Sequence, residues 1–385
     1  MDDGGNLILF GASTRAAAFS ALRAGLRPWC ADLFADADLQ TRCPAMRLPG
    51  PYPDGFLEWI GAELPGPWMY TGGLENRPWL VERMARRRPL WGNDCPALLK
   101  ARNPAVVYAA VRAAGLPAPA VHAFFRRAPA AGRWLVKPIW GLGDPIHFWT
   151  AADVADRPSL LVYLQEYVEG ESRAAVYCGD GKRAALLGVS RQLVGEDWLH
   201  AAPFRYCGSI GPLSVDAATR AALETLGSAL ARRCGLRGLF GVDGVDGAGG
   251  FFPVEVNPRY TASVEVLEYG GGLSALAWHR SAFVASPRPA PLADAPTGCV
   301  GKAVYFAPRN LTFPAEGPWA DVLRSPPPLA GPPAFADIPH PGTHIKAGRP
   351  VLTFFARGDA PGVCLDGLRR VAADLDRLLL DGPQP

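Results

Sequence analysis

The most constraining feature of the sequence is a pair of strand-like segments, residues 239–245 and 251–256, joined by a glycine-rich turn. This pattern predicts an antiparallel hairpin. Glu255 and Asn257 are two positions apart, so they face the same side of their strand, and Asp243 can lie opposite them on the neighbouring strand. The hairpin therefore presents three oxygen-bearing side chains on one face.

These three side chains lie within a segment that is otherwise rich in Phe and Val. One interpretation is an ordinary hairpin with a solvated polar face. The convergence of several polar groups among apolar residues instead indicates a ligand that offsets their desolvation. Mg²⁺ prefers oxygen ligands and completes its coordination shell with water and phosphates, so we expect a metal site on Asp243, Glu255 and Asn257. Arg259 is next on that face and can place a fixed cation beside a phosphate.

The charge balance argues against a general polyanion-binding protein. Lys and Arg number 39 against 36 Asp and Glu in 385 residues, which supplies no electrostatic reason to bind nucleic acid or an anionic membrane. No segment approaches the roughly 20 apolar residues that span a bilayer, and the acidic start lacks the features of a secretory signal. We expect a cytoplasmic protein with small-molecule partners, and its eight dispersed cysteines predict reduced thiols.

The first ninety residues have the pattern of a parallel α/β unit. An apolar strand at 7–10, a helix at 14–24 and a second strand at 29–33 follow one another closely. Asp32 ends the second strand, where a dinucleotide-binding fold would place a ribose ligand. Only Gly11 of the required glycine-rich fingerprint is present, however, so an NAD site is disfavoured.

The remainder of the chain predicts two α+β regions. Extended segments dominate after residue 115, and Asp216 is a candidate N-cap for a helix that runs to Cys234. A proline-rich connection begins near residue 286. Strand-like segments at 301–306 and 351–355 and an amphipathic helix at 363–380 follow it.

Four segments resemble the ATP-grasp superfamily, in the order that the superfamily has them. Gly238–Asp243 followed by Pro253–Arg259 resembles its metal-binding hairpin. The apolar strand that ends at Lys137 resembles the strand whose lysine contacts the nucleotide phosphates, and Gly141 and Gly143 stand where the family has a glycine-rich flap over those phosphates.

The remaining segment, Leu164–Glu171, lies between the flap and the hairpin in the sequence. It resembles the hinge where main-chain groups read the adenine edge and an acidic residue holds the ribose. By this match Glu166 and Val168 supply main-chain contacts, and Glu171 or Glu169 supplies the ribose carboxylate. The nucleotide-binding residues that the resemblance implies are Lys137, Gly141, Gly143, Gln165, Glu166, Tyr167, Val168 and Glu171.

The resemblance implies an ATP-grasp fold, of α/β plus α+β class. Its parts would be an N-terminal parallel α/β domain at 1–90, an ATP-grasp domain at 91–285 with a hinge near 165–171, and a small C-terminal α+β domain at 286–385. One departure is the absence of a second phosphate-binding lysine, because Asn103 stands near its expected place. Lys100 and Arg102 are the candidates to replace it.

The activity implied is that of an ATP-dependent carboxylate–amine ligase that works through an acylphosphate. ATP and Mg²⁺, with Mn²⁺ as an alternative metal, would be its cofactors, and Arg259 and Lys137 its catalytic cations. An ATP-dependent carboxylase using bicarbonate and a non-catalytic nucleotide-binding protein are the alternatives. Arg191 is either a clamp for a substrate carboxylate or a surface arginine. The two substrates are not predicted, and a homodimer is the default assembly.

Overall fold

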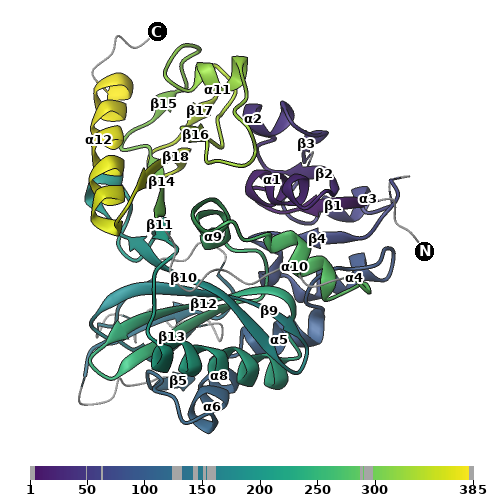
Figure 1. Ribbon diagram of the computed structural model, residues 1–385, viewed down its shortest axis with the longest axis vertical. Coiled ribbons are helices and arrows are strands. Elements are labelled where there is room, and N and C mark those ends of the chain that lie inside the picture. The colour runs from purple at the N-terminus through teal and green to yellow at the C-terminus, as the bar shows by residue number, and fades with distance from the viewer. Residues whose placement is uncertain are drawn as a thin grey trace.

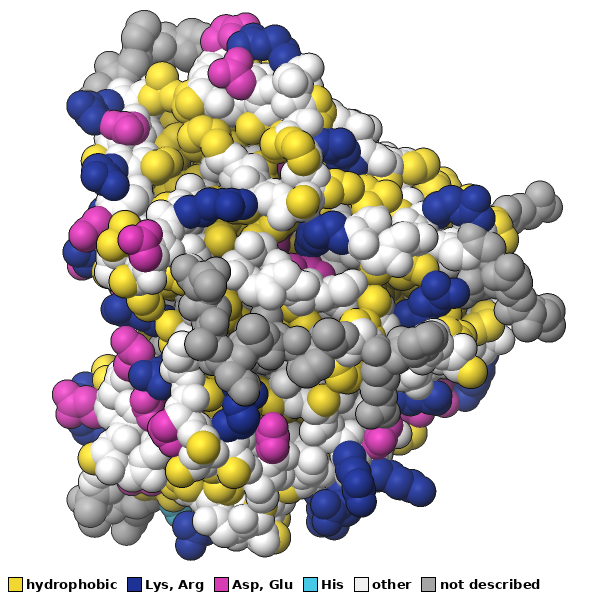
Figure 2. Space-filling model, viewed as in Figure 1, with side chains coloured by type: hydrophobic (Ala, Val, Ile, Leu, Met, Phe, Trp, Pro, Cys, Tyr) yellow, Lys and Arg dark blue, Asp and Glu magenta, His cyan; other side chains and the backbone are white. Residues whose placement is uncertain are grey.

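The computed structural model describes residues 5–48, 50–61, 64–123, 132–141, 146–150, 153, 162–286, 289 and 298–380. Figure 1 shows the N-terminal elements in purple beside α9 and α10, with a large sheet below them and the C-terminal helix α12 along the opposite flank. Among the helices described, none combines the length and apolarity needed to cross a bilayer. On the face drawn in Figure 2, basic and acidic side chains are interspersed across the surface.

The N-terminal region is a four-stranded parallel sheet, as predicted. Its strand order is β3-β2-β1-β4, and helix α1 joins β1 to β2. The predicted strand–helix–strand unit is therefore confirmed. The strands are β1 (Asn6–Phe10), β2 (Arg27–Asp32), β3 (Ala45–Arg47) and β4 (Trp68–Tyr70). The helices of this region are α1 (Arg15–Arg23), α2 (Ala37–Gln40), α3 (Phe56–Trp59), η1 (Leu74–Asn76), α4 (Pro78–Ala85) and α5 (Cys95–Ala101).

Asp32 is used to hold this fold together. Its buried carboxylate accepts hydrogen bonds from the Thr14 amide at 2.9 Å, the Thr14 hydroxyl at 2.7 Å, the Phe34 amide at 3.0 Å and the Ala35 amide at 2.6 Å. A carboxylate already bonded to four donors of its own loops has little capacity left for a ribose. That the first turn does not form an NAD site stays a prediction.

The core of the molecule is an eight-stranded antiparallel sheet, ordered β13-β12-β9-β10-β11-β14-β18-β16. Alternate residues of β9 face its two sides: Tyr177 packs with α8, whereas Val176 packs with α9, α10 and α1. Asp216 caps α8 by accepting from the Thr219 amide at 2.9 Å, as predicted. The strands are β9 (Glu171–Asp180), β10 (Ala184–Val194), β11 (Tyr206–Gly211), β12 (Arg237–Gly247), β13 (Gly250–Asn257), β14 (Cys299–Phe306), β16 (Phe335–Ala336) and β18 (Pro350–Gly358).

A smaller sheet, ordered β5-β8-β6-β7, carries the segment with Lys137 and the predicted hinge. Its strands are β5 (Val121–Ala123), β6 (Trp134–Pro138), β7 (His147–Phe148) and β8 (Val162–Glu166). The helices described after α5 that flank the two sheets are α6 (Pro104–Ala113), η2 (Asp197–Leu199), α8 (Ala217–Cys234), α9 (Ser263–Gly271) and α10 (Ala275–Ser281).

The C-terminal strands continue the large sheet, because β14 pairs with β11 and with β18. Helix α12 (Pro361–Leu380) packs against β14 and β18, and its face with Leu368 and Leu375 is buried. Helix α11 (Ala320–Arg324) and the short pair β15 (Leu311–Thr312) and β17 (His344–Ile345) complete this region. The division into three domains, with boundaries near 90 and 285, stays a prediction.

Candidate functional site

The predicted hairpin is β12 and β13, and it places the three oxygen-bearing side chains together. Asp243 pairs directly with Glu255 in the register of the two strands. Asn257, two positions further along β13, donates from its side-chain nitrogen to Asp243 Oδ2 at 2.8 Å. The spatial arrangement expected from the alternation of the strand is therefore confirmed, while metal binding stays a prediction.

The same hairpin contains a β-bulge that serves the site. The register shifts between Asp243 and Gly244, so that Val254 has no partner on β12. Its carbonyl oxygen instead accepts hydrogen bonds from Lys137 Nζ at 3.0 Å and from Gln165 Nε2 at 3.2 Å. The bulge thus joins the large sheet to the small sheet at this point.

The two carboxylates of the hairpin have opposite electrostatic surroundings. Burial, with the neighbouring charge of Glu255, raises the pKa of Asp243 to about 7. Burial also disfavours ionised Glu255, but the charges of Arg102 and Lys137 outweigh it and lower the pKa of Glu255. Asp243 also accepts from Gln192 Nε2 at 2.9 Å. The site is therefore short of positive charge at Asp243.

Three basic side chains surround the hairpin. Arg102 pairs with Glu255 at 2.5 Å between Nη1 and Oε1. Arg259 donates from Nη2 to the side-chain oxygen of Asn257 at 3.3 Å, and its Nε pairs with Glu75 at 2.6 Å. Lys137, on the neighbouring sheet, is buried and also donates to Gln165 Oε1 at 3.0 Å. Negative charge on a bound ligand would therefore meet three cations from three parts of the fold.

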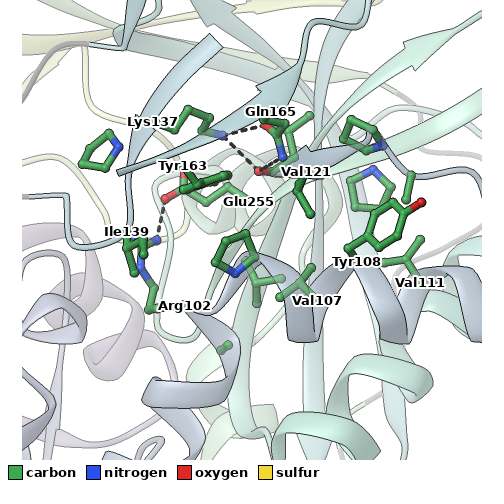
Figure 3. Close-up of a pocket in the computed structure, with 18 of the residues that line it drawn as sticks. Arg102, Val107, Tyr108, Val111, Val121, Lys137, Ile139, Tyr163, Gln165 and Glu255 are labelled. Carbon is green, nitrogen blue, oxygen red and sulfur yellow. Dashed lines mark hydrogen bonds and ion pairs between the residues drawn. The ribbon is translucent and has the colours of Figure 1, made fainter. Parts of the chain in front are cut away.

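A cavity of about 180 Å³ opens beside these groups. In Figure 3, the polar side chains Arg102, Lys137 and Gln165 lie toward one side of this pocket, and Tyr108 and Val111 of α6 lie toward the other. A mostly apolar pocket with a few converging polar groups is the common form of a small-molecule site.

Arg102, not Lys100, lines the pocket. Lys100 is exposed near the end of α5, whereas the Arg102 side chain is 7% exposed. Its Nε is buried and has no hydrogen-bond partner among the described residues. Of the two candidates that the sequence offered, Arg102 is therefore the basic side chain that faces the site, while its part in binding phosphate stays a prediction.

Strand β8 ends next to the pocket, at the hinge residues that were predicted to read adenine. Gln165 lines the pocket. The amides of Glu166 and Tyr167 already donate to Ala120 and Arg133, at 2.9 and 2.8 Å. Their amides are therefore engaged within the protein.

For the remaining hinge and flap residues the structure is informative at two positions. Val168 follows the hinge strand, and it has no backbone hydrogen bond among those seen within the described part of the chain. Gly141 lines the pocket, while Gly143 lies outside the described residues.

Glu171 lies away from this group. It pairs in register with Asp246, which is three positions from Asp243 and so faces the other side of the sheet. Its carboxylate contacts Arg173 Nε at 3.0 Å and Arg191 Nε at 3.6 Å. The structure therefore brings neither Glu171 nor Arg191 to the pocket beside Lys137.

Two residues at the site carried no signal in the sequence. Glu75 is buried and holds Arg259, but 184 positions separate the two. Gln192 reaches Asp243 from β10 only because that strand lies two places away in the sheet. The described residues contain no cluster of three His, Cys, Asp or Glu side chains suited to a metal, so the candidate metal site consists of two carboxylates and one amide.

Comparison with known proteins gives one family and many similar folds. A family model described as an ATP-grasp domain matches residues 101–263. An L-amino acid ligase from Bacillus licheniformis has a similar structure, with a TM-score of 0.69, 14% identity and coverage of 96% of this chain and 97% of that one. No curated protein matches the chain in sequence.

Two further solved structures show the same extent of likeness. An N5-carboxyaminoimidazole ribonucleotide synthetase from Thermus thermophilus has a TM-score of 0.67 and 18% identity, over 98% of this chain and 100% of that one. A biotin carboxylase from Campylobacter jejuni has a TM-score of 0.68 and 13% identity, over 95% of this chain and 90% of that one. At such identities the likeness is one of fold.

Proposed function

The chain carries an ATP-grasp domain and belongs to the ATP-grasp superfamily, and on that premise we propose that it is an ATP-dependent ligase that joins a small-molecule carboxylate to an amine. The observation that carries the proposal is that two carboxylates, one amide and three basic side chains meet at the hairpin, and that three of these groups, Glu255, Arg102 and Lys137, line one pocket. Such a group suits a nucleoside triphosphate and its metal ion.

The residues of the hairpin fit a magnesium ion. Asp243 and Glu255 lie side by side, and Asn257 adds an amide oxygen, which is the donor set that Mg²⁺ accepts together with phosphate oxygens. The raised pKa of Asp243 supports this fit, because it reports a buried carboxylate that lacks enough positive charge nearby. When bound, the ion would neutralise triphosphate charge and fix its orientation.

The basic side chains have separate tasks in this proposal. Lys137 and Arg102 flank the pocket and would hold the phosphates of the nucleotide, which assigns to Arg102 the place of the missing lysine. Arg259 would lie beside the transferred phosphoryl group and stabilise its equatorial oxygens. Its contact with Glu75 keeps the guanidinium in one orientation before substrates arrive.

The reaction proceeds in two steps. A carboxylate oxygen of the first substrate attacks the γ-phosphorus, the bond to the bridging oxygen breaks, and ADP leaves from an acylphosphate. The amine then attacks the acyl carbon and displaces inorganic phosphate, giving an amide. The cations lower the repulsion between the anionic substrate and the triphosphate, so positioning and electrostatics supply most of the rate enhancement.

The test is a screen for ADP release. Purified protein with Mg-ATP is given a panel of carboxylic acids, each with and without a panel of amines, and hydroxylamine is added to trap an acylphosphate as a hydroxamate. The proposal predicts ADP release that requires a carboxylate and forms hydroxamate. A parallel series in bicarbonate-depleted buffer addresses the alternative, a carboxylase. Release that depends on bicarbonate alone would reject the amine ligase in favour of that activity.

A further inference from the structure

One short turn of the N-terminal region reaches both sides of the candidate nucleotide site. The 3₁₀ turn η1 follows β4 and contains Glu75 and Asn76. Glu75 extends to Arg259, which follows the metal-binding hairpin on the large sheet. Asn76 extends to Gly141, which follows β6 of the small sheet. Neighbouring residues of one turn thus contact the segments that directly follow a strand of each of the two sheets.

The contact of Asn76 with Gly141 is a matched pair of hydrogen bonds. The side-chain nitrogen of Asn76 donates to the Gly141 carbonyl at 2.9 Å, and its side-chain oxygen accepts from the Gly141 amide at 3.2 Å. An Asn side chain can bond the N–H and the C=O of one residue at the same time only when the side chain and that residue are held in one relative orientation. Both bonds are exposed to solvent, so their role is to fix geometry more than to add stability.

A second contact at the same place joins the same two parts of the fold. The Trp79 ring of α4 lies 6.4 Å from the Trp140 ring, between centroids. Trp79 is 61% exposed, so this pair packs on the surface and not in a core. Trp140 immediately precedes Gly141, and Ile139 and Gly141 both line the pocket. The segment held by Asn76 is therefore part of the pocket wall.

We infer that Asn76 is a positioning residue for nucleotide binding. It fixes Gly141 and, through Gly141, the part of the pocket wall that follows Lys137. This inference rests on the proposed function, since it takes the pocket to be the nucleotide site. It assigns the N-terminal region a share in binding the nucleotide, in addition to the two sheets between which the pocket lies. Asn76 does not itself line the pocket.

The test compares Asn76→Leu, which has a similar volume and neither hydrogen-bonding group, with Asn76→Gln, which keeps the amide. Hydrogen exchange of a peptide covering residues 134–141 is measured without nucleotide, and Mg-ATP affinity is measured by calorimetric titration. Loss of two exposed hydrogen bonds predicts exchange faster by about three- to tenfold and a Kd for Mg-ATP raised by a similar factor in Asn76→Leu. Asn76→Gln recovers part of both. Where turnover is measured, KM for ATP rises while kcat changes little, because Arg259 and Lys137 are intact.

The matched control is Asn310→Leu. Asn310 also accepts a hydrogen bond from a backbone amide, that of Ala347 at 2.9 Å, but in the C-terminal region. This variant should leave the exchange of residues 134–141 and the Kd unchanged. Unchanged exchange and affinity in Asn76→Leu would overturn the inference and leave the proposed function standing. Absence of Mg-ATP binding by the unaltered protein would refute both.

Discussion

Replacing Glu255 by Gln tests the proposed metal site most directly. The substitution keeps the size of the side chain and one acceptor oxygen for Arg102, so the contact now seen at 2.5 Å is weakened but not removed. Glu255 is 34% exposed in its side chain, so solvent screens the pair, and the loss of charge should cost about 1 kcal/mol of folding free energy. The fold should therefore remain intact.

The effect on turnover should be much larger. Removing a preorganised group that stabilises developing charge lowers kcat by about 10² to 10³-fold, or about 3 to 4 kcal/mol of activation free energy. The assay is carboxylate-dependent ADP release at saturating ATP over a range of Mg²⁺ concentrations, together with chemical unfolding of both proteins. Loss of a metal ligand should also raise the Mg²⁺ concentration that gives half-maximal rate.

A matched control uses another Glu–Arg pair. Glu82 contacts Arg86 at 2.7 Å on an exposed helical face, and Glu82→Gln should leave kcat unchanged. The reasoning is refuted if Glu255→Gln retains near-normal turnover and an unchanged Mg²⁺ requirement while Glu82→Gln behaves as expected. That result would make the Arg102–Glu255 pair a structural contact and remove Glu255 from the proposed metal site.

Three further predictions concern binding and stability. Lys137→Ala should weaken Mg-ATP binding by about tenfold or more, because a buried ammonium at the pocket is lost, and an unchanged Kd in a calorimetric titration would count against its phosphate role. Asp32→Ala leaves four donors without their acceptor and should lower the free energy of unfolding by about 3 kcal/mol in urea denaturation; a loss below about 1 kcal/mol would contradict its structural role. Burial lowers the pKa of His279 to about 4, so the folded state resists a proton that the unfolded state takes up below about pH 6.5. Stability should therefore be complete above pH 6.5 and fall by about 3 kcal/mol toward pH 4, and His279→Gln should flatten this part of the curve; an equal slope in both proteins would exclude His279 as the cause.

The local sequence pattern was sufficient to predict the hairpin, the helix that begins after Asp216 and the side of the hairpin that carries the three oxygen-bearing side chains. Period-two alternation put Glu255 and Asn257 on the same side of β13, and the structure pairs Asp243 with Glu255 as expected. The cap at Asp216 was likewise predictable, because an Asp side chain that bonds the amide three residues ahead is a local interaction. Such features depend on neighbours in the chain and so appear in the sequence itself.

The bulge at Val254 was not predicted, although it belongs to the same hairpin. Pro253 is typical of an edge strand or a bulge, because it cannot donate to the ladder, but which residue lacks a partner depends on the register of two strands. Its consequence, a free carbonyl for Lys137 and Gln165, depends in turn on how the small sheet packs on the large one. The sequence singled out Lys137 but not the contact that orients it, and the phosphate role of Lys137 stays a prediction.

Tertiary structure alone decided which charged residues meet. Arg102 and Lys100 are two positions apart and alike in charge, yet only Arg102 faces the pocket, because the fold buries one side of the chain at the end of α5. Glu75 meets Arg259 across a gap that no local pattern spans. Side-chain periodicity sets the face of an element on which a residue lies, so the sequence by itself determined the hairpin and its three oxygen donors. The packing of whole sheets and helices decides which element faces which other element. This packing brought the three cations, the carbonyl of Val254 and the turn with Asn76 to the oxygen donors of the hairpin.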